Sequence, residues 1–227
     1  PITCAAMDPR GEFAYFGTYS PASQNKFIKV RLSDLSHVAS LNTEGDEFHT
    51  KVVVIDPLGQ FAYFGVSPQG GRARIVKINL SNFVRGSHLD LPSGLQFPLD
   101  SAAAIVDYNG EFAYFSAEAS GLPRIVKIDL PNFRYVSDLN VPGLGGTLIS
   151  AIIDDTGCFA YFGTYNRLPS PPLQNVVKVD LSAFTVSAII QLEQGENMLL
   201  SGIFDPYQQA AYFATGTSPG RLIKIDL

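Results

Sequence analysis

Short apolar runs separated by turn residues recur along the whole chain. One such run, Val52 to Ile55, ends at an Asp-Pro-x-Gly turn, and its consecutive apolar positions predict a strand buried on both faces. The next strand, Phe61 to Gly65, has the sequence Phe-Ala-Tyr-Phe-Gly. After a loop, Ile75 to Leu80 alternates branched apolar residues with polar ones, which predicts a half-buried strand. A shorter fourth strand follows at Ser87 to Leu91, and no segment shows helical periodicity.

This four-strand unit is repeated along the chain. The aspartates that open the turns are spaced by 48, 51, 47 and 51 residues, and the third strand of each unit carries a lysine in the same register. Two sequence blocks that recur in phase indicate a repeat architecture. The repeats span approximately residues 1–43, 44–93, 94–141, 142–193 and 194–227. The repeated residues are Asp8, Asp56, Asp107, Asp154 and Asp205, and Lys29, Lys77, Lys127, Lys178 and Lys224.

Four antiparallel strands every 49 residues or so, without helices, predict an all-β protein, a β-propeller of four-stranded blades. A β-sandwich is the alternative, but a sandwich does not require every unit to repeat the same residues. The fifth repeat stops after its third strand at Leu227, so we expect its outer strand to be missing and its edge to invite pairing. Since both termini fall inside the repeat pattern, the sequence favours part of a larger propeller over a closed five-bladed ring.

Composition narrows the class of protein. The hydrophobic fraction of 46% is enough for a packed core, and charged residues make up only 16%. The net charge of −5, with no basic stripe, argues against a nucleic-acid partner. No apolar run approaches the roughly 20 residues that a membrane span requires. Two cysteines are too few for a disulfide scaffold.

The repeat resembles the YVTN class of propeller repeats. The resemblance is carried by Ala14-Tyr15-Phe16-Gly17-Thr18 and its copies, and by Ile125-Val126-Lys127-Ile128-Asp129 in the later strand. Phe-Gly replaces the Val-x-Asn of that class, so the match is to the class and not to a particular member. The resemblance implies a cell-surface or secreted binding or scaffolding protein, with lactonase-like and quinoprotein propellers as enzymatic relatives.

Residues that recur once per blade are interpreted as structural. The aspartates are expected to cap their turns through backbone amides, in preference to forming a ring of Ca²⁺ ligands. The lysines are expected to reach water or a nearby carboxylate. The tyrosines are expected to pack between blades, although a five-fold aromatic set would also suit a sugar-binding platform. The tyrosine column is Tyr15, Tyr63, Tyr114, Tyr161 and Tyr212.

Candidate chemistry outside these columns is sparse. His37, His49 and His88 each stand alone, in a predicted loop or outer strand, and are expected to be ordinary surface residues. The chain contains no Gly-x-Ser-x-Gly elbow, phosphate-cradling loop or Cys-x-x-Cys motif. We therefore predict no catalytic residue, no metal site and no cofactor.

Three residues carry smaller predictions. Cys4 is expected to be a small buried residue, whereas Cys158 takes an exposed turn position and is predicted to be a free thiol or an intermolecular link. Asn79-Leu80-Ser81 is an N-glycosylation sequon, used only if a eukaryotic cell secretes the chain.

These observations predict a non-enzymatic extracellular scaffold, adhesion or protein-interaction module that presents loops from a rigid propeller. Its partners are expected to be proteins or neighbouring subunits. Two alternatives remain at this stage: a glycan-binding propeller with one site per blade, and a lactonase-like or other hydrolytic enzyme. The expected contact loops lie between the second and third strands, at 18–26, 67–74, 118–124, 164–175 and 215–221.

Overall fold

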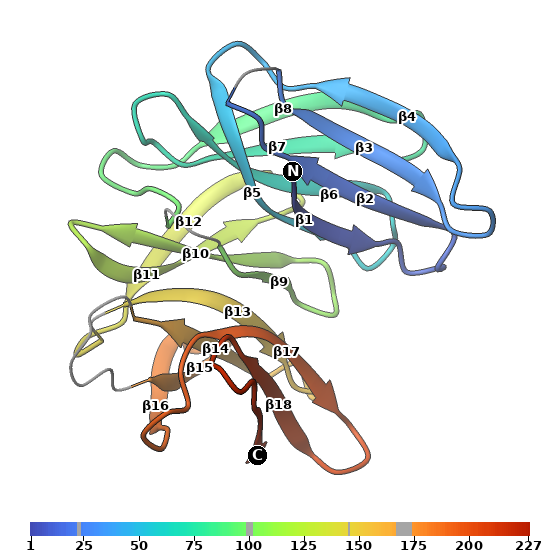
Figure 1. The fold of residues 1–227 in the computed structure, drawn as a ribbon. Coiled ribbons are helices and arrows are strands. Elements are labelled where there is room, and N and C mark those ends of the chain that lie inside the picture. The colour runs from blue at the N-terminus through green and yellow to red at the C-terminus, as the bar shows by residue number, and fades with distance from the viewer. Residues whose placement is uncertain (22–23, 99–101, 145, 167–173) are drawn as a thin grey trace.

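The chain folds into five antiparallel sheets arranged as the blades of a β-propeller (Figure 1). This is a computed structural model, and it describes every residue except 22–23, 99–101, 145 and 167–173. Each sheet lies within one sequence repeat, and no helix occurs in the part of the chain so described. The propeller prediction is confirmed, and the sandwich alternative is wrong.

Within every blade the strands are paired in chain order, beginning with the innermost. The bounds in blades 1 and 2 are β1 (Ile2–Met7), β2 (Phe13–Thr18), β3 (Lys26–Arg31), β4 (His37–Asn42), β5 (Glu47–Ile55), β6 (Phe61–Pro68), β7 (Arg74–Asn79) and β8 (Val84–Asp90). Blades 3 and 4 comprise β9 (Ala104–Val106), β10 (Phe112–Ala119), β11 (Leu122–Asp129), β12 (Arg134–Asn140), β13 (Thr147–Ile153), β14 (Phe159–Tyr165), β15 (Asn175–Asp180) and β16 (Thr185–Gln191). Blade 5 comprises β17 (Leu199–Asp205), β18 (Ala210–Thr215) and β19 (Leu222–Asp226).

The inner strands set the order of the blades. β1 packs against β5, β5 against β9, β9 against β13, and β13 against β17. Figure 1 shows the resulting arc, with the N-terminus in the first blade and the C-terminus in the last. In the described part of the chain, no strand of blade 1 packs closely against a strand of blade 5. Blade 5 has three strands, as the sequence predicts.

The turns between first and second strands follow from local chemistry. The Asp8 carboxylate accepts hydrogen bonds from the amides of Glu12 (2.8 Å) and Phe13 (3.2 Å). Gly11 takes a φ of 69°, a backbone conformation that suits glycine. The aspartates of the other four repeats cap their own turns in similar ways, so the turn-capping prediction is confirmed.

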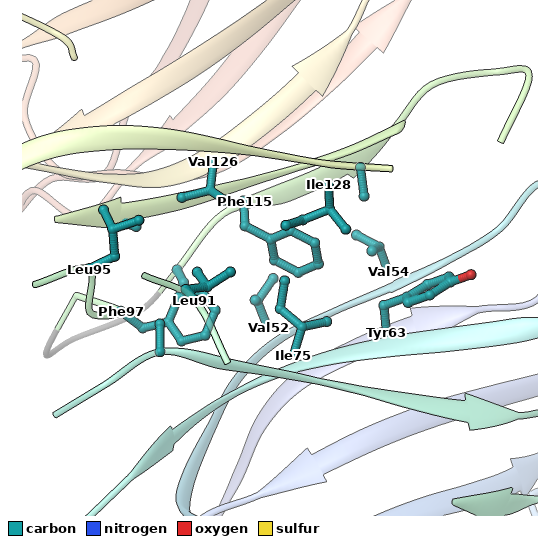
Figure 2. Close-up of a cluster of buried hydrophobic side chains, with 14 of the residues drawn as sticks. Val52, Val54, Tyr63, Ile75, Leu91, Leu95, Phe97, Phe115, Val126 and Ile128 are labelled. Carbon is teal, nitrogen blue, oxygen red and sulfur yellow. The ribbon is translucent and has the colours of Figure 1, made fainter. Parts of the chain in front are cut away.

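Four buried clusters, one at each blade junction, form the core. Figure 2 shows the cluster between blades 2 and 3, where Val52, Tyr63 and Ile75 meet Phe115 and Ile128. Four tyrosines of the repeated column are only 1–2% exposed, which confirms that they pack between blades. Both faces of an interior blade are therefore covered by neighbouring blades, whereas each sheet of a two-layer sandwich has only one covered face.

Three sequence-based boundaries are wrong. The fourth strand of blade 2 is not shorter than the third, because β8 begins at Val84 and not at Ser87. β5 begins at Glu47, well before Val52, because its polar first residues pair with the end of β6. The predicted loop at 118–124 is a tight hairpin, in which β10 and β11 are joined by Ser120 and Gly121 with φ values of 51° and 75°. Positive φ at both central residues is the two-residue turn that matches the twist of paired strands. Much of the loop at 164–175 lies outside the described residues.

Candidate functional site

The lysine column lies against aromatic rings between the blades. The Nζ atoms of four lysines lie 4.0–4.2 Å from the centroid of the phenylalanine that opens the second strand of the same blade. Lys77, Lys127 and Lys178 remain partly exposed, and the charges of Asp8 and Asp56 act on Lys29 and Lys77, so the ring contacts add to the water and carboxylate contacts that the sequence predicts. Burial within the aromatic layer lowers the pKa of Lys29 and of Lys77. The pairs are Lys29 with Phe13, Lys77 with Phe61, Lys127 with Phe112, and Lys178 with Phe159.

A second aromatic ring reaches each of three junctions from the following blade. Phe83, Phe133 and Phe184 occupy the turn between third and fourth strands, with φ values of 50°, 47° and 51°. A bulky residue adopts this conformation only when surrounding contacts hold it there. The rings lie 5.7–6.0 Å from the tyrosine of the preceding blade, so each clamps one blade to the next.

These repeated aromatic groups line hollows on the side of the propeller where the turns between first and second strands lie. One hollow, of about 580 Å³, is lined by Asp8, Tyr15 and Lys29 of blade 1 and by Leu80 of blade 2. Lys29 Nζ donates to the Leu80 carbonyl oxygen at 3.1 Å. Lys29 covers the face of the Phe13 ring, and Tyr15 is only 1% exposed. Neither ring of this hollow therefore offers a face on which a sugar could stack. The glycan-binding alternative therefore finds no support in the tyrosine column.

The junction between blades 1 and 2 contains a charged cluster that the repeat does not predict. The Glu47 side chain is completely buried and forms a two-pronged ion pair with Arg85, with contacts of 2.6 and 2.9 Å. Arg74 Nη1 lies 3.5 Å from the same carboxylate and 2.9 Å from Asp46. The hydrogen bond from Arg74 to Asp90, at 2.6 Å, lowers the pKa of that carboxyl group. Burying these charges is tolerated because each has a partner.

An aromatic patch of Tyr19, Phe48 and His49 adjoins this charged cluster. Tyr19 stacks on His49, with ring centroids 4.2 Å apart, and meets Phe48 edge-on at 5.6 Å. Phe48 is 47% exposed. Its carbonyl oxygen accepts a hydrogen bond of 2.5 Å from the Asn25 side chain, which is itself buried. Phe48 is thus the exposed ring of a partly buried aromatic patch, on a backbone that the buried Asn25 side chain holds in place.

A cavity of about 370 Å³ lies beside the patch. Its lining includes Asn25, Thr43, Glu47 and Phe48, together with residues of the two neighbouring loops. The Thr43 hydroxyl donates to the Glu47 carbonyl oxygen at 3.2 Å, and the Gln24 side chain donates to the Thr43 carbonyl oxygen at 2.7 Å. The cavity therefore offers polar groups next to an exposed aromatic ring.

The histidines divide between two environments. His37 and His88 lie on exposed outer strands, as the sequence predicts. His49 does not stand alone, because β5 extends far enough to bring it onto Tyr19. Burial, and secondarily the charge of Lys51, lowers the pKa of His49 to about 4. The imidazole is consequently neutral at physiological pH. The long polar stretch before Val52 was the one sequence feature that could have indicated this extension of β5.

The remaining candidate residues lie apart from this junction. Cys158 is exposed in the turn of blade 4, and Cys4 lies in β1 with no disulfide between them. Asn79 ends β7, where its side-chain oxygen accepts hydrogen bonds from the Ser81 amide (3.0 Å) and hydroxyl (2.7 Å). Among the residues that the structure describes, no group of three His, Cys, Asp or Glu side chains is placed to hold a metal ion.

Thiol labelling should distinguish the two cysteines. Burial raises the pKa of Cys4 to about 12, so its reactive thiolate is scarce, whereas Cys158 is open to solvent. We expect a maleimide added to the native protein to modify Cys158 at least about 100-fold faster than Cys4. Mass spectrometry of the digested protein measures both rates. Equal rates in the native state, with the Cys158→Ser variant as control, would show that β1 is not packed as described.

Comparison with known proteins identifies the fold. No family model and no curated protein matches the chain. Hydrazine synthase from Kuenenia stuttgartiensis matches with a TM-score of 0.72 and 12% identity, over 100% of this chain and 66% of its own. TolB from Acinetobacter baumannii matches with a TM-score of 0.68 and 17% identity, over 100% and 52%. The β-propeller domain of Cps50 (Swd1) from Myceliophteria thermophila matches with 0.64 and 12%, over 94% and 62%.

These similarities establish the propeller architecture alone, because the identities are low. The chain spans less than two thirds of the length of each of the three structures. In the described residues, no helix has the length and apolar character that a membrane crossing needs.

Proposed function

We propose that the chain is a non-enzymatic protein-interaction propeller whose partner binds over the junction of blades 1 and 2. The observation that carries this proposal is the aromatic patch. Phe48 is exposed, yet its backbone is fixed by Asn25 and its neighbour Glu47 is held by two arginines. Exposed aromatic residues on a rigid base are favoured in protein interfaces because binding them costs little conformational entropy.

The position of the patch agrees with the way repeat proteins bind. Features repeated from blade to blade serve packing, whereas the Tyr19–Phe48–His49 patch occurs at one junction within the residues that the structure describes. A functional surface is expected where one repeat departs from the others and its loops are exposed. Tyr19 comes from the loop at 18–26 that the sequence identifies as a contact loop.

Site-specific photo-crosslinking tests this proposal. A photoreactive phenylalanine analogue at position 48 is expected to form one discrete protein adduct in cells that make this chain. The same analogue at Tyr207, which is 97% exposed on the opposite rim, is the matched control and should form none. Adducts that are absent at position 48, or identical at both positions, contradict the proposal.

We assign the protein to the cell surface or the extracellular space, on the resemblance of its repeat to the YVTN class. Cys158 provides a direct readout, because it is an exposed thiol. A maleimide that does not cross membranes should label it on intact cells, or in the medium, and should not label Cys158→Ser. Labelling only after the cells are lysed would place the protein inside the cell.

A further inference from the structure

The linker between blades 1 and 2 departs from the other linkers at a position that all four junctions share. Thr43, its first residue, donates its amide hydrogen to the Asn25 carbonyl oxygen at 2.9 Å. Residues in the same place at the following junctions make the same bond, at 2.9–3.2 Å, to a carbonyl oxygen at or next to the start of the third strand. They are Leu91, which donates to Ala73, Val141, which donates to Pro123, and Leu192, which donates to Gln174.

At the other junctions an apolar side chain at this position fills the end of the core. Leu91 is 0% exposed, and Figure 2 shows it beside Leu95 and Phe97 at one end of the cluster between blades 2 and 3. Val141 is 1% exposed at the next junction, and Leu192 packs against the cluster between blades 4 and 5. The linker at 43–46 is Thr-Glu-Gly-Asp, so it has no apolar side chain to place there.

The cavity of about 370 Å³ lies where this side chain is missing. Its lining includes Thr43 and Asn25, each 3% exposed, and these residues correspond to Leu91 and Ala73 at the next junction. Gln24 and Ser20 add further hydrogen-bonding groups. The cavity therefore suits a polar or charged occupant better than an aliphatic one, because burying an aliphatic group there would leave polar groups without water.

The charges beside the cavity favour a cationic occupant. Among the described residues of its lining, the charged ones are Glu44 and Glu47, and the Glu44 side chain is 54% exposed. In the ion pairs of this junction the carboxylates outnumber the arginines, and they remain in excess even when Arg72, which binds a backbone carbonyl oxygen nearby, is counted. The paired groups are Glu44, Asp46, Glu47 and Asp90, with Arg74 and Arg85.

The aromatic lining adds a second attraction for a cation. Phe48 lines the same cavity as Glu44 and is 47% exposed. Ammonium and guanidinium groups bind over aromatic faces, and the chain already uses this contact four times in its lysine column. A cationic side chain of a partner would therefore find a ring, a reachable carboxylate and buried acceptors at one place.

We propose that the partner protein inserts a lysine or arginine side chain into this cavity, between Phe48 and the Glu44 carboxylate. The inference deepens the proposed function and rests on it, since the partner has to bind over this junction for its side chain to enter. Complementary charge at such a contact selects the partner and speeds association. The cavity lies between two blades that both have four strands, inside the repeat array.

Photo-crosslinking at position 48, combined with changes in the cavity, tests this inference in cells that make the chain. Glu44→Gln removes one charge at constant shape, and the adduct yield is expected to fall about 3–5-fold, as for one partly exposed ion pair. Thr43→Leu installs the residue of the next junction and is expected to lower the yield about 10-fold or more, because it fills the cavity. Glu12→Gln, at an exposed turn of blade 1, is the matched control and should leave the yield unchanged.

Mass spectrometry of the adduct identifies the crosslinked segment of the partner, in which a lysine or arginine is expected. A synthetic peptide of that segment should bind the parent chain about 10-fold more tightly than the same peptide with norleucine in place of the cation. Against Glu44→Gln the difference between the two peptides should shrink about 3–5-fold, because one of the two contacts is already lost. Fluorescence anisotropy measures the four affinities, and thermal unfolding checks that every variant is folded.

Three results overturn this inference and leave the interaction surface standing: a crosslinked segment without lysine or arginine, an adduct yield that neither Glu44→Gln nor Thr43→Leu lowers, or equal binding of the two peptides. An adduct to another part of this chain also overturns it. Absence of any adduct at position 48 contradicts the proposed function, and this inference falls with it.

Discussion

Tyr161→Ala is expected to lower the free energy of unfolding by about 3–5 kcal/mol, the range found when large aromatic side chains are removed from packed cores. Tyr161 is 1% exposed and packs with Ile152, Val176 and Phe213 across the junction of blades 4 and 5. The substitution leaves a cavity there and removes one of the rings near Lys178. Urea denaturation followed by tyrosine fluorescence and circular dichroism measures the loss.

Two variants serve as controls for this prediction. Tyr161→Phe keeps the buried ring and is expected to cost less than about 1.5 kcal/mol, as volume-conserving changes do. Tyr207→Ala removes a ring that is 97% exposed and should leave the stability within about 0.5 kcal/mol of the parent. If Tyr161→Ala and Tyr207→Ala were equally stable, the tyrosine column would not be the core of the junctions.

Glu47→Gln is expected to destabilise the protein by about 2–3 kcal/mol. Breaking a buried ion pair usually costs about 3–5 kcal/mol, because the charge that remains keeps its desolvation penalty. We expect a smaller loss here because Arg74 and Arg85 each keep another carboxylate as a partner. Glu47 is fully buried, while Arg74 and Arg85 are 12% and 15% exposed. Arg74 keeps Asp46 and Asp90, and Arg85 keeps Glu44 at 2.9 Å.

The matched control for this change is Glu12→Gln, at an exposed position in the turn of blade 1. It should alter stability by less than about 0.5 kcal/mol. Hydrogen exchange adds a local readout, because loss of the Glu47 carboxylate should speed exchange at the start of β5, where Phe48 lies. A Glu47→Gln protein as stable as Glu12→Gln, with unchanged exchange in β5, would show that the charged cluster does not support the aromatic patch.

The lysine column shows where sequence reasoning reaches its limit within a correctly predicted blade. Its register in the third strand was predictable, because strand alternation is a local property. The aromatic partners of the lysines were not predictable. Lys29 meets Phe13 only because β3 pairs with β2, and the Phe83 ring comes from another blade. The recurring Leu-x-x-Phe of the turns at Phe83, Phe133 and Phe184 was a visible signal for that clamp, although its left-handed backbone was not.

What the sequence by itself determined is the blade and its repetition. The capping of the turn at Asp8, the φ of Gly11 and the alternation within Ile75 to Leu80 depend on residues close in the chain, and five copies in phase then imply the propeller. The tertiary structure alone decided the site. Glu47, Arg74 and Arg85 are up to 38 residues apart and meet because a strand extends beyond its apolar core, which no local pattern encodes.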